Sequence, residues 1–438
     1  MKEQFYDLAA RLSGDLHNGE VLLCNLSAER SDFVRFNRGK VRQAGSVEQR
    51  RLTVRLVHER RQAAATLTLA GEDGDLAQAR AALVRLREIT AQLPEDPWLV
   101  IADTPHSTES ERRGVVPAPE AVVEHVIGAA KGRDLVGFYA GGTIYRGFAN
   151  SLGQRNWHEV DSFNLDWSLY LQTDKAVKSG YAGYEWSPAV FDAKLEAAAR
   201  ELELLALPAR TMVPGDYRAY LAPRALEELT GLLAWGGYSA KARQTRQSPL
   251  LRMEHGERLS PQVTLVENTA DGVAPPFQHD GYVKPPRVTL IEGGRLGDAL
   301  VCPRSAKEYS LATNAANAGE APESLDMAAG ALASPDILTA LDTGLYVSNL
   351  WYLNYSDRPA GRITGMTRFA TFWVEGGRMV APVNVMRFDD TIYRMLGENL
   401  VDLTSERELL LDASTYEERS TGAARLPGAL LARLRFTL

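Results

Sequence analysis

The sequence predicts an α+β protein with an antiparallel N-terminal sheet, helices beside that sheet, and a strand-rich C-terminal domain. Two observations lead to this prediction. In the first half of the chain, segments with the alternation of half-buried strands are interspersed with segments whose apolar residues recur at helical spacing. From residue 211 onward, short strand-like segments separated by glycines dominate. We therefore expect one domain at 1–210, with a possible sub-boundary near 94–119, and a second at 211–438.

The composition sets mild limits on the class of protein. The chain has 438 residues, 45% of them apolar and 24% charged, as in a soluble globular protein with an ample core. Its net charge of -7 argues against a general nucleic-acid binder, which would show a basic face. No apolar run reaches the roughly 18 residues of a membrane span, and no secretory signal is evident. We expect a cytoplasmic protein that binds neither nucleic acid nor membrane.

The first hundred residues show a helix, several strands and a second helix. Phe5, Leu8, Ala9 and Leu12 recur at helical spacing and predict the first helix. Strands are expected at 21–26, 31–36, 51–57 and 63–69, with a polar turn at 58–61, before a long helix at 75–93. Arginine is dense from residue 30 to 61. A groove that binds anions would use such a cluster. The acidic balance of the chain instead favours a solvated sheet face whose arginines pair with carboxylates.

The next section begins with a linker and continues with strands rich in aromatic residues. Prolines between 94 and 119 indicate the linker, and a helix is expected at 120–131. A hairpin at 136–148 is expected to turn at Gly141-Gly142, because paired glycines readily adopt positive φ. A helix with Ser187 as its N-cap and Pro188 at its first position should extend to about residue 205. The aromatic residues between 157 and 186 belong either to a peptide-binding wall or to the core, and the sequence does not decide.

The third section opens with a strand-like segment and a helix from about Pro223 to Trp235. Its apolar positions are 225, 226, 229, 232 and 233, and Gly236-Gly237 should end it. Another short helix is expected from Ser334-Pro335-Asp336 to before Gly344. Strands are expected at 345–350, 369–374 and 379–383, the last two joined by a hairpin at 375–378.

Several segments of the chain resemble the TldD/PmbA family and occur in the same order as in that family. PmbA is also called TldE. One is 31–36 with the arginine-rich strand pair that follows it. A second is 361–365 leading into 373–383, which resembles the family's glycine-containing loop, strand, "xENGE" turn and strand ending in Pro-Val. A third is 275–281 followed by 290–296, which resembles "FDDEG…LIENGxL". Together these segments span nearly the whole chain.

This resemblance implies a two-lobed protein that belongs to a cytoplasmic peptidase system. In the family, a TldD subunit carries HExxxH on a helix and a distant cysteine as metal ligands. It pairs with a TldE subunit that lacks them, and the heterodimer degrades unfolded or small peptides and matures some peptide products. A metal ion in such a site polarises the scissile carbonyl and lowers the pKa of a bound water, and the glutamate acts as general base.

The expected helix at 223–235 contains no histidine. Laying the TldD pattern without gaps from Pro214-Gly215 places its histidines near Gly231 and Gly236 and its glutamate near Leu232, none of which can serve. No histidine lies between His158 and His255 that a shift of register could bring into place.

The remaining histidines and cysteines do not match the spacing of the family's metal ligands either. His158-Glu159 is a His-Glu pair, but it sits in strand-like sequence with no second histidine at a workable spacing. Cys24 and Cys302 are the two cysteines, neither belongs to a CxxC pair, and none follows Cys302 to act as the distal ligand. The chain therefore resembles the TldE-type member. We expect no catalytic residues, no metal ligands and no zinc or iron of its own, and the sequence identifies no binding residues.

The resemblance favours a non-catalytic subunit that pairs with a TldD-type, HExxxH-bearing partner and acts on unfolded peptide, with a homodimer also possible. The alternative is a self-sufficient hydrolase that uses His255, His279 and Asp280, whose glycine-rich loops offer nitrogen and oxygen ligands. Loop histidines beside carboxylates are more often hydrogen-bonded surface groups. A binding module that acts as a modulator of DNA gyrase follows from descriptions of the family, and no residue here supports it. Two aromatic stretches, 350–353 and 369–373, are either covered by a partner or packed inside one lobe.

Overall fold

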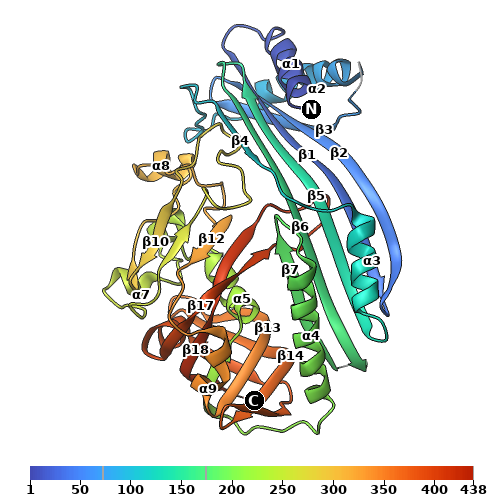
Figure 1. Ribbon diagram of the computed structural model, residues 1–438. Helices are drawn as coiled ribbons and strands as arrows, with labels where there is room; N and C mark the ends of the chain where they lie inside the picture. Colours follow the sequence, from blue (N-terminus) through green and yellow to red (C-terminus); the bar gives the residue numbers. More distant parts are fainter. Residues whose placement is uncertain (72–73, 173–174, 438) are drawn as a thin grey trace.

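The computed structural model describes residues 1–71, 74–172 and 175–437. The chain forms two lobes, each built around one sheet (Figure 1). The sheet of the N-terminal lobe uses residues 20–183, and the sheet of the C-terminal lobe uses residues 215–436. The α+β class predicted from the sequence is confirmed. The boundaries of independently folding domains stay a prediction.

The N-terminal sheet consists of long strands that cross the whole lobe. Their order is β3-β2-β1-β5-β6, and β4 and β7 both pair with β6. The ladder between β4 and β6 is parallel, and the other described ladders of this sheet are antiparallel. The strands are β1 (Glu20–Asn37), β2 (Lys40–His58), β3 (Arg61–Thr68), β4 (Thr108–Arg112), β5 (Asp134–Asn150), β6 (Arg155–Gln172) and β7 (Lys175–Gly183).

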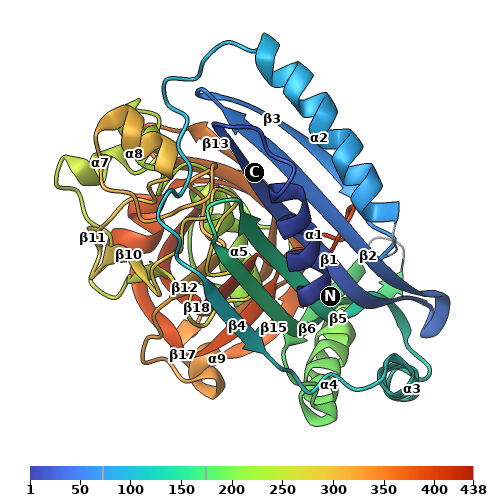
Figure 2. The same cartoon turned by 90° about the horizontal axis from the view of Figure 1, so that it is seen from above.

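Four helices cover one face of this sheet. Even-numbered residues of β1 share that face: Leu22 and Leu26 pack in the core cluster that includes α1 and α2, whereas Val34 and Phe36 pack in the cluster that includes α3 and α4. Figure 2 shows α2 on the side of the sheet away from the C-terminal lobe. The opposite face of the sheet faces the C-terminal lobe and carries polar residues such as Ser27 and Arg51 as well as buried apolar residues such as Leu23 and Phe148. The helices are α1 (Lys2–Ser13), α2 (Gly74–Gln92), α3 (Pro119–Ala129) and α4 (Pro188–Leu205).

Two predictions about the strands of this lobe are wrong. The segments 21–26 and 31–36 are parts of one strand, β1, and the predicted hairpin at Gly141-Gly142 is the middle of the continuous strand β5. Gly142 lies opposite Ser31 with φ +137°, and a Cβ there would be 2.1 Å from the carbonyl oxygen of Arg30. Glycine is needed at this position because the backbones of β1 and β5 approach closely, not because the chain turns.

The aromatic residues between 157 and 186 contribute mainly to the core. Trp157, Phe163 and Trp167 are at most 2% exposed, so they do not form a peptide-binding wall. Ser187 precedes α4 as predicted, but its side chain makes no capping hydrogen bond. Its backbone N–H donates to the Tyr181 hydroxyl at 2.9 Å instead.

The C-terminal sheet follows the order β11-β10-β9-β12-β18-β16-β14-β13-β8. β8 also pairs with β18, which closes part of the sheet into a ring. In addition, β15 pairs with β14, and β17 pairs with β18. The strands are β8 (Gly215–Leu221), β9 (Leu265–Glu267), β10 (Val288–Glu292), β11 (Arg295–Leu296), β12 (Ser324–Met327), β13 (Gly344–Asp357), β14 (Arg362–Glu375), β15 (Arg378–Pro382), β16 (Arg387–Thr391), β17 (Leu400–Leu411) and β18 (Ala423–Phe436).

The main helix of this lobe, α5 (Pro223–Ala234), packs against β13 and β18. Leu226, Leu229 and Leu233 on its apolar face are fully buried, and Gly236 with φ +83° follows its end. The helix predicted here, with its glycine stop, is confirmed. The smaller helices are α6 (Ala240–Gln244), α7 (Leu251–Glu254), α8 (Pro303–Tyr309) and α9 (Ile337–Leu341), with a 3₁₀ turn at Ser334–Asp336 and a π turn at Arg394–Glu398.

Within the described ranges, the structure contains no helix with the length and apolar character needed to cross a bilayer.

The close approach at Gly142 generates a stability prediction. Gly142→Ala should lower the free energy of unfolding by about 2 kcal/mol or more, because the new methyl group meets backbone and the positive φ disfavours alanine. Gly45→Ala in β2 is the matched control, since a Cβ at Gly45 has no neighbour within 4 Å. Urea unfolding measures both variants. Equal midpoints for the two would contradict this account of β5.

Candidate functional site

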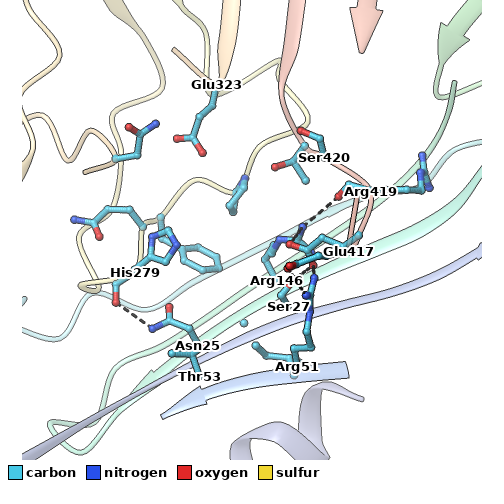
Figure 3. A pocket seen from close by; sticks show the side chains of 18 of the residues that line it. Asn25, Ser27, Arg51, Thr53, Arg146, His279, Glu323, Glu417, Arg419 and Ser420 are labelled. Atoms are coloured by element: carbon cyan, nitrogen blue, oxygen red, sulfur yellow. Dashed lines mark hydrogen bonds and ion pairs between the residues drawn. The ribbon is translucent and has the colours of Figure 1, made fainter. Parts of the chain in front are cut away.

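A hollow of about 600 Å³ lies between the two lobes and is lined by polar and charged side chains. Its floor is the polar face of β1, β2 and β5, and its walls are loops of the C-terminal lobe (Figure 3). The segment 412–422, which joins β17 to β18, forms one of these walls. Other lining residues include Asn25, Ser27, Thr53, Phe277, Gln278, Asn317, Ser420 and Thr421.

Arg419 attaches the segment 412–422 to the N-terminal sheet. Only 5% of this residue is exposed. Its Nη1 donates to the carbonyl oxygen of Gly142 at 3.1 Å, and its Nη2 donates to the carbonyl oxygen and to the Oγ of Ser162, each at 2.8 Å. Burial lowers the pKa of Arg419 to about 10, a change that the nearby Glu29 carboxylate opposes. The guanidinium therefore remains charged at neutral pH and joins β5, β6 and the C-terminal lobe.

The residue before Arg419 neutralises two arginines in the floor of the hollow. The Glu418 carboxylate lies 3.1 Å from Arg51 and 3.4 Å from Arg146, and it accepts a hydrogen bond from the Ser27 hydroxyl. Burial opposes ionisation of Glu418, but the charge of Arg146 and the hydrogen bonds from Ser27 and Arg51 outweigh it and lower its pKa. Glu417 adds a second ion pair to Arg51 at 2.9 Å. The positive charge of the floor is thus balanced by carboxylates from the other lobe.

His279 and Asp280 lie on the opposite wall and are held against the sheet. The His279 carbonyl oxygen accepts hydrogen bonds from Asn25 and from Arg55, each at 3.1 Å, and Asp280 forms an ion pair with Arg55. His255 follows the end of α7, which contacts β11 in the C-terminal lobe. The structure therefore brings His279 and Asp280 together but leaves His255 elsewhere. The alternative three-residue site suggested by the sequence is not assembled.

His158 in β6 has a structural role. Its Nδ1 is 2.6 Å from the Ser110 hydroxyl, and its Nε2 is 2.9 Å from the carbonyl oxygen of Val273. Burial lowers the pKa of His158 to about 4, so the ring is neutral at pH 7. Since a carbonyl can only accept, Nε2 carries the proton and Nδ1 accepts from Ser110. This histidine joins the N-terminal sheet to the loop at 273.

The residues on and near α5 do not fit the metal site implied by TldD-type relatives. The helix carries no histidine, and its two adjacent carboxylates are Glu227 and Glu228. Burial raises the pKa of Glu227 to about 7, so it is only partly ionised at neutral pH. Across residues 1–71, 74–172 and 175–437, no three His, Cys, Asp or Glu side chains are grouped so that they could hold a metal ion. Cys302 is buried before α8, and its Sγ accepts from the backbone N–H of Ser305.

The arginine-rich stretch from 30 to 61 is largely paired, as the sequence analysis favours. Arg30 and Arg50 pair with Glu48, and Arg51, Arg55, Arg60 and Arg61 also contact carboxylates. No motif in the sequence marks Arg146 or Arg419 as residues of the site. One indication was present, because the polar run Tyr416-Glu417-Glu418-Arg419-Ser420 interrupts two apolar strands.

The two-lobed fold with its two sheets is that of a class of proteins with known structures. Over 99% of this chain and 100% of that chain, the fold is similar to TldE from Thermococcus kodakarensis, with a TM-score of 0.79 and 14% identity. It is also similar to two proposed modulators of DNA gyrase. The one from Thermotoga maritima has a TM-score of 0.77 and 15% identity over 100% of both chains. The one from Bacteroides thetaiotaomicron has a TM-score of 0.75 and 15% identity over 100% of this chain and 98% of that chain.

The family follows from the sequence of the C-terminal lobe. Residues 214–437, just over half of the chain, match the PmbA/TldA metallopeptidase C-terminal domain. The chain belongs to the PmbA/TldD family. Among curated protein sequences, none matches it.

The contacts of Arg419 generate the second prediction. Arg419→Met should lower the free energy of unfolding by about 3 kcal/mol, because it leaves Glu29 and the acceptors on Gly142 and Ser162 without their cation. The released segment should also be cleaved faster by a protease specific for glutamate, at Glu417 or Glu418. Urea unfolding and limited proteolysis measure the two effects.

The control is Arg433→Met in β18, an exposed arginine that has no ion pair within the described chain. It should change neither property. If Arg419→Met behaved like this control, Arg419 would not fasten the lobes.

Proposed function

We propose that this chain is the non-catalytic, TldE/PmbA-like subunit of a TldD-type metallopeptidase that degrades or processes peptides. One observation carries the proposal: α5, where the TldD-type members are expected to bear HExxxH, has no histidine and buries Leu226, Leu229 and Leu233 in the core. A hydrolytic metal site needs about three protein ligands around one open position, and the side chains of this helix cannot supply them. In this proposal the metal-activated water belongs to the partner subunit.

The contribution of this subunit is a polar wall for an extended peptide. The hollow between the lobes exposes side chains that donate and accept hydrogen bonds, among them Asn25, Gln278 and Asn317. Because the arginines of the floor are neutralised by Glu417 and Glu418, this hollow has little net charge. Such a surface suits unfolded peptides of varied sequence, since hydrogen bonds to backbone groups do not depend on the side chain.

A partner is also favoured by an exposed aromatic pair on β13. Trp351 is 46% exposed and Tyr352 74%, and the guanidinium of Arg368 lies 4.7 Å from the Trp351 ring centroid. By contrast, Ala370 and Phe372 are fully buried, so most of the stretch 369–373 packs inside the chain. Exposed aromatic residues of this kind are enriched at protein interfaces. We propose that a TldD-type subunit covers this pair, or a second copy of this chain when that subunit is absent.

The activity of the chain should depend on its partner. Alone, the purified protein should not cleave an unstructured peptide, because the residues that the structure describes form no site for a metal-activated water. Co-expression with an HExxxH-bearing homologue should produce cleavage that a chelator abolishes. A partner whose HExxxH histidines are replaced by alanine is the matched control and should give no cleavage. Chelator-insensitive hydrolysis by the isolated chain, lost on His279→Ala, would contradict the proposal.

A further inference from the structure

A second hollow, of about 490 Å³, contains positive charge that the fold leaves without a partner. It shares the segment 412–422 with the first hollow: Thr415 lines the second hollow, whereas Ser414 and Tyr416 line the first. Its cations are Arg35, Arg42 and Lys178.

Among the residues that line the second hollow, one carboxylate accompanies these three cations. It is Asp166, which lies 3.2 Å from Lys178 and 3.5 Å from Arg224. The side chains of Arg35 and Arg42 make no ion pair or hydrogen bond with the described residues of the chain. Arg35 instead lies 5.5 Å from the ring centroid of Phe138. Two guanidinium groups of this hollow thus lack a carboxylate in a protein whose net charge is -7, whereas Arg50, Arg51 and Arg55 further along β2 are paired.

A β-bulge in the N-terminal lobe directs one of these arginines. Along β1 and β2, Arg35 lies opposite Gln43, whereas Phe36 lies opposite Val41. Arg42 is therefore the extra residue of the bulge, and it lines the same hollow as Arg35. Gln43 lies opposite Arg35, so strict alternation would place its neighbour Arg42 on the other face of the sheet.

A second bulge, in the C-terminal lobe, directs an aromatic ring to the same place. Val347 of β13 lies opposite Thr371, and Asn349 lies opposite Arg368, so β14 has one extra residue between them. Phe369 lies in this bulge with φ +58°, a conformation that costs a bulky residue about 1–3 kcal/mol. Its ring lines the hollow, 5.9 Å from the Lys178 ammonium.

We propose that this second hollow binds a carboxylate of a peptide, either the C-terminal carboxylate or that of an Asp or Glu side chain. Arg35 and Arg42 donate to the carboxylate, and the adjoining residue of the peptide packs on Phe138 and Phe369. Arginine suits this role because its planar donors match the two oxygens of a carboxylate. The inference rests on the proposed function only in taking a peptide as the ligand. A nucleic-acid phosphate is disfavoured by the net charge of -7 and by the acidic segment 412–422 beside the hollow.

The test measures the binding of fluorescent peptides to the purified full chain by anisotropy, with no partner present. Three short peptides share one neutral sequence: the first has a free C-terminal carboxylate, the second is amidated, and the third is amidated with one internal glutamate. The first or the third should bind at least about tenfold more tightly than the second, since a charge-assisted pair of hydrogen bonds is lost. The preferred peptide identifies which of the two carboxylates is recognised.

The variant Arg35→Gln/Arg42→Gln should lose this preference. The matched control is Arg85→Gln/Arg433→Gln, which removes the same charge from exposed positions on α2 and β18 outside the hollow, and it should bind as the parent does. Equal binding of all three peptides, no effect of the Arg35/Arg42 variant, or displacement by a single-stranded oligonucleotide at lower concentration than by peptide would overturn the inference. Because no cleavage and no partner are needed, such a failure would leave the co-expression result untouched.

Discussion

The insertion of the Arg419 guanidinium into the N-terminal sheet is the interaction on which the space between the lobes depends. It bonds to β5 and β6 from a segment of the C-terminal lobe, and Gly142 supplies one of its acceptors. A buried cation of this kind is tolerated only when its donors are satisfied, so the segment 412–422 has little freedom to shift without exposing unpaired groups. Both hollows are bounded by this segment, and their shapes follow from its position.

The two faces of the N-terminal sheet serve different purposes. One face is apolar and packs under the four helices, which stabilises the lobe by burying side chains such as Leu22 and Phe36. The other face contains charged and hydroxyl residues that contribute little to stability, because pairing buried charges only roughly offsets the cost of removing them from water. Retaining such residues around the hollows between the lobes is consistent with a surface that binds polar chains. Within it, Glu417 and Glu418 neutralise the first hollow, and Arg35 and Arg42 leave the second one positive.

The helices were predictable because their periodic apolar positions are local. The same holds for the glycine stop after α5 and for the absence of histidine from that helix, which carries the argument about function. The strands were less predictable. The glycines at 141–142 have the composition of a turn, but their role is set by Ser31 on another strand. Likewise β1 looked like two strands, since Arg30 and Asp32 interrupt its apolar alternation.

The polar contacts of the site were not predictable from the sequence. Arg419 and Ser162 are separated by 257 positions, and no local pattern indicates that they meet. The two bulges are hidden for the same reason, because each is a property of the register between strands. The arginine cluster itself was visible, but which of its members would lack a carboxylate depends on loops that return from the other lobe.

Light scattering of the purified chain, with and without a TldD-type subunit at micromolar concentration, tests most directly whether this protein is a subunit of a peptidase. We expect the chain of 48.1 kDa to form a dimer by itself and to be recovered in a heterodimer when the partner is present. A mass near 48 kDa that stays constant when the partner is added would contradict the account.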